Sequence, residues 1–350
     1  MKSSEKRNPT IREVAKLARV GVMTVSRVIN DHPSVRTSTR KRVESAIIQL
    51  GYKQNEAARL LKGGRARIIG LIVPDLSDVF FASCAHTVQQ IARANGYMTL
   101  VASSERDAEL EMQEAELMAS RMISGLLIVT SLEEGSERLW NLQRPDFPIV
   151  AFDRPLPGLE TDAVLVENRT GAEGAVRHLM EHGHKRIACI GYDANVYTIN
   201  ERIHGYRDQM RSANLKTDIT LGLHNMEDIR QWVSSAMARE KRPTAVFALN
   251  HRTSSFLLRV LTEKKVKVPE EMAIVGFDDF ELASVVNPPL TTVLQSPVDL
   301  ARRSMALLMD RIRSGKTAMD DAPAKIMLPT RLVIIRSCGP HREEDIASLD

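Results

Sequence analysis

Residues 10–30 read TIREVAKLARVGVMTVSRVIN, and the spacing of apolar residues in this stretch predicts two short helices. Apolar side chains recur with helical periodicity over residues 11–18 and again over residues 22–29. Gly21 lies between the two segments, where it predicts a tight turn. Two short helices joined by a tight turn are typical of a helix-turn-helix unit.

The flanking residues extend this unit to a small domain. Thr10 followed by Glu13 has the spacing of a capping box, which predicts the start of the first helix. A third helix is predicted over residues 37–50, with Gly51 at its end. We therefore expect three helices packed in one domain over residues 1–53.

The charge distribution sets this N-terminal part apart from the rest of the chain. Residues 1–67 contain 16 Lys and Arg against 5 Asp and Glu, a net charge of +11. The remaining residues contain 32 basic and 39 acidic side chains, a net charge of −7. A basic head on a mildly acidic body indicates a module that binds a polyanion. A solvated basic tail is the alternative, but the apolar periodicity of the head favours a folded domain.

Residues 54–66, QNEAARLLKGGRA, are predicted to be a hinge helix and linker. The segment offers few apolar side chains to a core and contains Gly63 and Gly64 near its end. A helix this short is unstable alone in water, so we expect it to be only marginally helical by itself.

Residues 67–336 alternate between apolar strands and helices, which predicts an α/β fold. Continuous apolar runs such as IIGLIV, GLLIV and AIVGF are typical of parallel sheets covered on both faces. The alternation is long for one sheet, so we expect two doubly wound parallel sheets with a ligand cleft between their strand ends. The expected lobes are residues 67–166 with 298–328, and residues 167–297 with 329–336.

Several classes of protein and site are excluded by what the sequence lacks. No apolar run approaches the roughly 20 residues that cross a bilayer, and the N-terminus lacks the apolar core of a signal peptide, which indicates a cytoplasmic protein. The sequence has no Gly-rich phosphate loop, nucleophile elbow or zinc-ligand spacing, so we expect no catalytic residues, cofactor or metal. Residues 337–350 are predicted to be a disordered tail.

The three cysteines, Cys84, Cys189 and Cys338, are far apart and fit neither a disulfide framework nor a metal cluster. Cys84 and Cys189 are expected to be small core residues. His182 and His184, in the sequence HGHKR, are interpreted as part of a helix-to-strand turn rather than as metal ligands.

Taken together, these segments resemble the lactose-repressor (LacI-type) family of bacterial transcription regulators. Residues 10–30 are similar to the family's DNA-reading segment, and LGYKQNEAARLL (50–61) is similar to its hinge. VGFDDFELASVVNPPLTTVLQ (275–295) resembles its signature near the end of the core. The resemblance implies a periplasmic-binding-protein-like core and a homodimer that binds double-stranded operator DNA. It also implies a small-molecule effector that switches DNA affinity, and a cytoplasmic bacterial protein associated with the nucleoid when bound.

The second helix is expected to read DNA in the major groove with its N-terminal residues. Arg27 can donate two hydrogen bonds to guanine, and Val22 and Met23 can contact a thymine methyl group, whereas Val25 and Val28 are expected in the core. The resemblance further implies that hinge helices enter the minor groove, where Leu61 wedges into a base step. The full predicted DNA-binding set is Thr10, Val22, Met23, Thr24, Ser26, Arg27, Asn30, Thr39, Arg40, Asn55, Ala58 and Leu61.

The candidate effector contacts lie mainly at predicted strand ends. They are Phe80, Phe81, Asp153, Arg154, Arg202, Asn250, His251, Asp278 and Gln295. Carboxylate, guanidinium and amide groups converging on one site suit a polyhydroxylated ligand. His251 and Arg252 stand where the family usually has Asp, and this predicts a cationic cleft for a sugar acid or a phosphorylated sugar.

Other ligands and functions stay open at this point. A neutral sugar and a nucleobase or other metabolite are alternatives to the acidic effector. A binding protein without a regulatory role is an alternative to a repressor of carbohydrate or sugar-acid catabolic genes, although the basic head argues against it. An enzyme using Asp278 and Asp279 is disfavoured because neighbouring residues on a strand point to opposite faces.

Overall fold

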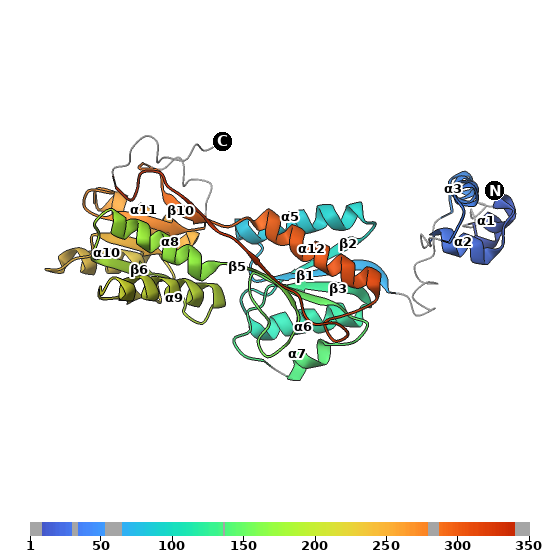
Figure 1. The fold of residues 1–350 in the computed structure, drawn as a ribbon, viewed down its shortest axis with the longest axis horizontal. Coiled ribbons are helices and arrows are strands. Elements are labelled where there is room, and N and C mark those ends of the chain that lie inside the picture. The colour runs from blue at the N-terminus through green and yellow to red at the C-terminus, as the bar shows by residue number, and fades with distance from the viewer. Residues whose placement is uncertain (1–8, 30–33, 53–64, 136, 279–286, 340–350) are drawn as a thin grey trace, which may run out of the picture. The chain divides into compact units, whose positions relative to one another are not determined.

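The computed structural model describes residues 9–29, 34–52, 65–135, 137–278 and 287–339 (Figure 1). The chain divides into two compact units, Met1–Ala66 and Arg67–Asp350, and each is described by itself. No helix within the described ranges is long and apolar enough to cross a membrane.

The first unit contains the three predicted helices, α1 (Ile11–Ala18), α2 (Val22–Ile29) and α3 (Thr37–Leu50). The capping box is confirmed, because the Thr10 side chain accepts from the Glu13 backbone N–H and the Glu13 carboxylate accepts from the Thr10 backbone N–H. Gly51 ends α3 in the left-handed conformation, with φ 63°. The helices pack around a core of fully buried side chains, among them Val14, Val25 and Val43.

The second unit contains two sheets of six strands each. The first sheet has the order β11-β5-β4-β3-β1-β2. Its strands are β1 (Ala66–Val73), β2 (Met98–Ser103), β3 (Ile123–Ile128), β4 (Ile149–Phe152), β5 (Asp162–Val166) and β11 (Lys325–Leu328). Helices α5 (Val79–Ala94) and α12 (Pro297–Ser314) cover one face, while α6 (Ala108–Ser120) and α7 (Glu137–Leu142) cover the other (Figure 1). We call this sheet with its helices the first lobe.

The second sheet has the order β12-β10-β9-β8-β6-β7, which repeats the connectivity of the first. Its strands are β6 (Ile187–Ile190), β7 (Asp218–Thr220), β8 (Ala245–Ala248), β9 (Ala273–Phe277), β10 (Thr291–Leu294) and β12 (Arg331–Val333). Helices α8 (Asn168–Glu181) and α9 (Tyr197–Ser212) cover one face, while α10 (Met226–Ala238) and α11 (His251–Glu263) cover the other. This sheet with its helices is the second lobe.

Three short segments connect the lobes: β5 to α8, β10 to α12, and β11 to β12. Neighbouring strands in the described sheets run parallel, as predicted, except that β12 runs antiparallel to β10. This exception has a simple cause. β11 leaves the first sheet at the carboxyl edge of its strands, and only Pro329 and Thr330 separate it from β12. β12 therefore enters the second sheet from the carboxyl edge.

The prediction of a disordered tail beginning at residue 337 is wrong for its first residues. Ser337 and Cys338 are both fully buried. The Ser337 hydroxyl donates to the Ile274 carbonyl at 2.6 Å and accepts from the Thr291 backbone N–H at 2.8 Å. These bonds fix the segment against β9 and β10, so the second lobe continues past residue 336. All three cysteines are buried and unbridged, which confirms the prediction for Cys84 and Cys189.

Candidate functional site

Helix α2 of the first unit divides its side chains between the core and the solvent. Val25 and Val28 are buried, as predicted, with 0% and 6% of their surface exposed. On the opposite side Val22 and Met23 are 42% and 72% exposed, and Arg27 is exposed as well. Within this unit the exposed face of α2 therefore carries Val22, Met23 and Arg27, the side chains that a helix lying in the major groove would present to base edges.

The other predicted DNA contacts are less uniform. Thr10 is exposed at the start of α1, where its hydroxyl donates to the Glu13 carboxylate at 2.9 Å. The remaining ones that the structure describes are half-buried: Thr24, Ser26, Thr39 and Arg40. Four predicted contacts lie outside the described residues: Asn30, Asn55, Ala58 and Leu61.

In the second unit, one cavity of about 60 Å³ lies between the two lobes and collects every predicted effector contact. These are Phe80, Phe81, Asp153 and Arg154 from the first lobe, with Arg202, Asn250, His251, Asp278 and Gln295 from the second. The convergence follows from the fold, because the carboxyl ends of the strands in both sheets face this cavity. A wider cavity of about 400 Å³ shares Arg106, Arg154 and Tyr192 with it, so the cleft has room for a larger ligand.

The second-lobe side of the cavity is organised around Arg202, which is only 2% exposed. Its guanidinium donates to Asp278 at 2.9 and 3.4 Å, to the Leu249 carbonyl at 2.7 Å and to Asn168 Oδ1 at 2.8 Å. Gln295 Nε2 also donates to Asp278 Oδ1, at 2.6 Å. Charge-assisted hydrogen bonds of this kind hold the Asp278 carboxylate in one orientation.

The first-lobe side is organised around Asp153, which follows β4 and is 3% exposed. Arg154 Nε lies 3.4 Å from Asp153 Oδ2, and Arg154 Nη1 donates to the Thr130 carbonyl at 3.0 Å. Burial raises the pKa of Asp153 to about 6, and the positive charges of Arg154 and Arg202 only partly oppose this. Asp153 is therefore a carboxylate whose charge is poorly compensated.

Among the described residues, two contacts connect the lobes at the cavity. Asp78 caps α5 by accepting from the Phe80 backbone N–H at 3.0 Å, and its other oxygen lies 3.9 Å from His251 Nε2. The Arg106 guanidinium lies 5.8 Å from the centre of the Tyr192 ring. Both are weak interactions between groups on opposite lobes, so the separation of the lobes can change at small cost.

Three buried polar atoms lining the cavity have no hydrogen-bond partner among the described residues. They are Arg154 Nε and Asn250 Nδ2, which are donors, and Gln295 Oε1, which is an acceptor; Arg154 Nε keeps its 3.4 Å ion-pair contact with Asp153 but makes no hydrogen bond there. An unsatisfied buried polar group costs about 1–3 kcal/mol, so a cluster of them is typical of a site that receives a polar ligand. A ligand that satisfies both kinds of atom must both donate and accept hydrogen bonds.

The charge of the cavity is more balanced than the sequence predicted. Its lining contains Arg106, Arg154, Arg202 and Arg252 against Asp78, Asp153 and Asp278, a net charge of +1 with His251 neutral. Arg202 and Arg154 pair with Asp278 and Asp153, and Arg106 lies 3.3 Å from Asp75. Arg252 is exposed, has no carboxylate within 4 Å among the described residues, and interacts with Asp75 only at longer range through its charge.

Some lining residues were missed by the sequence analysis: Arg106, Tyr192, Thr198 and Ile199. Tyr192 follows strand β6 by two residues, so the rule that identified Asp153 also applies to it. Arg106 lies in the loop after β2 and would have been found in the same way. Thr198 and Ile199 lie in the first turn of α9 and carry no comparable signal.

Comparison with known proteins follows the same division of the chain. Residues 10–55 match the description of bacterial regulatory proteins of the lacI family, and residues 176–338 match a periplasmic binding protein-like domain. The chain is 30% identical over 335 residues to the HTH-type transcriptional regulator DegA of Bacillus subtilis strain 168, which covers 95% of this chain and 98% of that protein.

Solved structures are similar over nearly the same length. The transcriptional regulator CelR in complex with cellobiose is 30% identical, with a TM-score of 0.68, covering 94% of this chain and 100% of that one. The Lac repressor dimer bound to operator and the anti-inducer ONPF has a TM-score of 0.75 at 22% identity, covering 95% and 100%. The second likeness concerns the fold alone.

Proposed function

The chain belongs to the LacI family of bacterial regulatory proteins, and from this premise we propose that it represses carbohydrate or sugar-acid catabolic genes under the control of a polyhydroxylated effector. The coarser function needs no proposal: the chain is a DNA-binding transcriptional regulator with an effector-binding domain, and not an enzyme. The proposal concerns the ligand, the residues that hold it, the DNA contacts and the assembly.

The polyhydroxylated effector is supported mainly by the three unsatisfied atoms of the interlobe cavity. A hydroxyl group donates and accepts, so a ligand rich in hydroxyls can satisfy Arg154 Nε, Asn250 Nδ2 and Gln295 Oε1 together. Phe80 and Phe81, whose rings meet edge to face at 5.2 Å, offer apolar surface for the carbon face of a sugar ring. The similar regulator CelR is described in complex with cellobiose, which supports the same ligand class.

An acidic group on the effector is supported by Arg252 and His251. The other arginines of the cavity already lie beside carboxylates, which leaves Arg252 to meet a carboxylate or phosphate of the ligand. We therefore propose a sugar acid or a sugar phosphate, rather than a neutral sugar, as the effector. A nucleobase, which could stack on the phenylalanines, is the contrasting class for the test.

Calorimetric titration of the purified full chain tests this choice. The probes are a neutral hexose, the corresponding hexonic acid, a hexose phosphate and a purine base. We expect an acidic sugar to bind, and Arg252→Ser to weaken it about fivefold to tenfold by removing one ion pair. Arg259→Ser is the matched control, because Arg259 is 73% exposed on the same helix. Binding of neutral sugars without the acids would refute the acidic effector, and binding of the purine alone would refute the carbohydrate class.

The DNA contacts are proposed from the exposed face of α2, with Arg27, Met23 and Val22 at base edges. We further propose Thr10, Thr24, Ser26, Asn30, Thr39 and Arg40 near the DNA backbone, and the hinge residues Asn55, Ala58 and Leu61 in the minor groove. Selection of duplexes from a random pool gives the operator. Arg27→Ala is expected to weaken that operator by about 1–3 kcal/mol and relax specificity at one position. Arg177→Ala, exposed on α8, is the control expected to leave binding unchanged.

A homodimer in the bacterial cytoplasm, at the nucleoid when bound to DNA, completes the proposal. Strand β2 is an edge of the first sheet and exposes Met98 and Leu100, which are 66% and 43% accessible. Exposed apolar side chains on a sheet edge are typical of an interface. Light scattering is expected to give a dimer for the wild type and a monomer for Leu100→Asp. A monomeric wild type at micromolar concentration would refute this part.

A further inference from the structure

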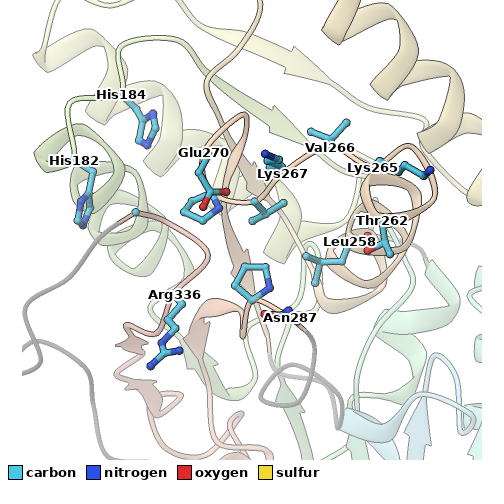
Figure 2. A pocket seen from close by; sticks show the side chains of 14 residues that line it. His182, His184, Leu258, Thr262, Lys265, Val266, Lys267, Glu270, Asn287 and Arg336 are labelled. Atoms are coloured by element: carbon cyan, nitrogen blue, oxygen red, sulfur yellow. Dashed lines mark hydrogen bonds between the residues drawn. The ribbon is translucent and has the colours of Figure 1, made fainter.

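A cavity of about 1080 Å³ lies in the second lobe, apart from the effector cleft. Figure 2 shows His182 and His184 along one side of it, above Arg336, with Lys265 and Thr262 on the opposite side. Gly339, near the end of the described chain, also lines it. None of the residues of this cavity belongs to the effector site, so a separate role must be sought for it.

A group of three potential metal ligands adjoins this cavity, and one of them, His182, lines it. His178 is in the last turn of α8, and His182 is the C-cap of that helix. Residues four apart lie on the same face of a helix, so both imidazoles face the same way. Cys338 comes from the segment after β12, and its Sγ lies 3.2 Å from His178 Nε2. The ligand atoms of all three residues lie within 4.8 Å of one another.

These separations are close to those of a tetrahedral zinc site. With Zn–N of about 2.0–2.1 Å and Zn–S of about 2.3 Å, two ligands of one ion lie about 3.5 Å apart. The three ligand atoms lie up to 4.8 Å apart, so they must shift by about 1 Å to reach these separations. Small rotations of the His182 side chain provide this shift. The two imidazole rings already lie edge to face, with their centres 4.7 Å apart.

The surroundings of the cluster suit a bound cation. Thr291 Oγ1 lies 2.9 Å from Cys338 Sγ, where its hydroxyl can donate to a thiolate and orient it. A side chain at residue 339 would crowd the histidine, since a Cβ on Gly339 would stand 3.0 Å from His182 Nδ1. His182 is half-buried and lines the cavity, so an ion can enter from solvent and keep a water as its fourth ligand.

We propose that His178, His182 and Cys338 form a binding site for Zn²⁺ or a divalent d-block ion of similar softness, with a fourth ligand from the adjoining cavity. On binding, the Cys338 thiol loses its proton to solvent and its sulfur bonds to the metal. Both imidazoles bind as neutral ligands. The ion joins the C-terminal end of α8 to the segment that follows β12.

The sequence disfavoured a metal here because its ligand spacing is not local. His182 and His184 were interpreted together as part of a turn, and Cys338 was compared only with the other two cysteines. In the fold, His178 and Cys338 are 160 residues apart in sequence yet in contact. A third histidine nearby in sequence, His184, is engaged differently, since its Nδ1 lies 3.0 Å from Thr244 Oγ1.

Cobalt substitution tests the site on the full chain after removal of metals with a chelator. We expect one Co²⁺ per chain, with a thiolate-to-cobalt charge-transfer band in the near ultraviolet, and displacement of that band by Zn²⁺. Cys338→Ser should abolish the band. His182→Gln, at a half-exposed position that the fold tolerates, should weaken binding about tenfold or more while circular dichroism stays unchanged.

The control variant is His204→Gln, because His204 is 43% exposed on α9 and is not part of the cluster. It should bind cobalt as the wild type does. Zn²⁺ should also raise the unfolding temperature of the wild type and of His204→Gln, but not of His182→Gln. Absence of the thiolate band in the wild type, or equal affinity in the wild type and His182→Gln, would overturn the proposal. Neither result depends on the effector or on DNA.

Discussion

Asp153 and Asp278 occupy equivalent positions in the two lobes. Each follows a phenylalanine at the carboxyl end of a strand, β4 or β9, that is third from the β11 or β12 edge of its sheet. Each has a left-handed backbone, with φ 64° at Asp153 and 67° at Asp278. Aspartate is one of the few residues that tolerates this conformation, which turns both carboxylates toward the cleft.

The two carboxylates differ in how their charge is compensated. Asp278 receives hydrogen bonds from Arg202 and Gln295, whereas Asp153 has one ion-pair contact of 3.4 Å with Arg154. The same backbone geometry therefore serves two purposes. Asp278 is a fixed anchor, and Asp153 is the carboxylate that can still change its protonation or accept from a ligand.

The largest expected effect comes from removing the guanidinium on the anchored side. Arg202→Met should lower the free energy of unfolding by about 3–5 kcal/mol, because it removes a buried guanidinium and leaves the half-buried Asp278 carboxylate without its ion-pair partner. Arg154→Met on the other lobe should lower it by only about 1–2 kcal/mol, because Asp153 can take up a proton instead. Chemical denaturation measures both, and equal losses would remove the distinction between the two lobes.

A smaller effect is expected from the residue two positions before each aspartate, which is Ala151 in β4 and Gly276 in β9. A Cβ on Gly276 would stand 2.7 Å from Ser254 Oγ, and that hydroxyl is already bonded to the Asn250 carbonyl. Gly276→Ala should therefore destabilise the core by about 1–3 kcal/mol.

Two companion variants locate the cause of that loss. Adding Ser254→Ala to Gly276→Ala should restore part of the stability by removing the clashing oxygen. Gly174→Ala, in α8 with no atom near its added Cβ, should instead stabilise by about 0.5–1 kcal/mol. If Gly276→Ala has the same free energy of unfolding as the wild type, Ser254 can move away from an added Cβ and β9 is not closely packed at Gly276.

The protonation of Asp153 gives a pH-dependent effect. Its pKa rises from 3.8 to about 6 in the folded protein, facing Arg154, Arg202, Asp278 and Asp78. Between these pH values the folded state keeps a proton that the unfolded state has released, so this contribution to stability is present at low pH and lost as the pH rises through 6.

Asp153→Asn removes this dependence. The unfolding temperature of the variant minus that of the wild type should be higher at pH 7.5 than at pH 5, by roughly 2 °C, corresponding to about 1 kcal/mol. Thermal unfolding at the two pH values measures the difference. A difference of the opposite sign would mean that the surrounding arginines outweigh burial.

The smallest effect is expected at the rim of the cleft. Arg106 and Asp75 form an ion pair in which both side chains are about one-third exposed, at 37% and 32%. Arg106→Ala should change the free energy of unfolding by less than about 0.5 kcal/mol. A loss as large as that of Arg154→Met would show that the rim contributes as much as the buried side.

Much of the fold was predictable because its signals are local. The helices of the head follow from apolar spacing, a capping box and Gly51, and continuous apolar runs predicted the parallel sheets. The apolar run that indicates a buried strand is harder to recognise where a charged residue interrupts it. β5 begins with Asp162, which is buried because Arg311 donates to it at 2.7 and 2.8 Å, and no local rule predicts a partner so distant in sequence.

The candidate cleft was predictable for the same reason as the sheets. The carboxyl ends of parallel strands meet at one edge, so Asp153, Asn250 and Asp278 could be assigned to one place without knowing any distance. The compensation of each charge was not predictable. Whether an arginine is available to a ligand depends on its neighbours in space, and ion pairing makes the cleft less cationic than His251 and Arg252 had suggested.

The connections between the lobes limit how they can move. The three tethers contain Glu167 alone, Gln295 with Ser296, and Pro329 with Thr330. Three such short tethers suppress sliding and leave bending as the main degree of freedom. Gln295 belongs to one tether and also donates to Asp278 in the cavity. A molecule that contacts Gln295 therefore contacts one of the connections about which the lobes bend, without any intervening residue.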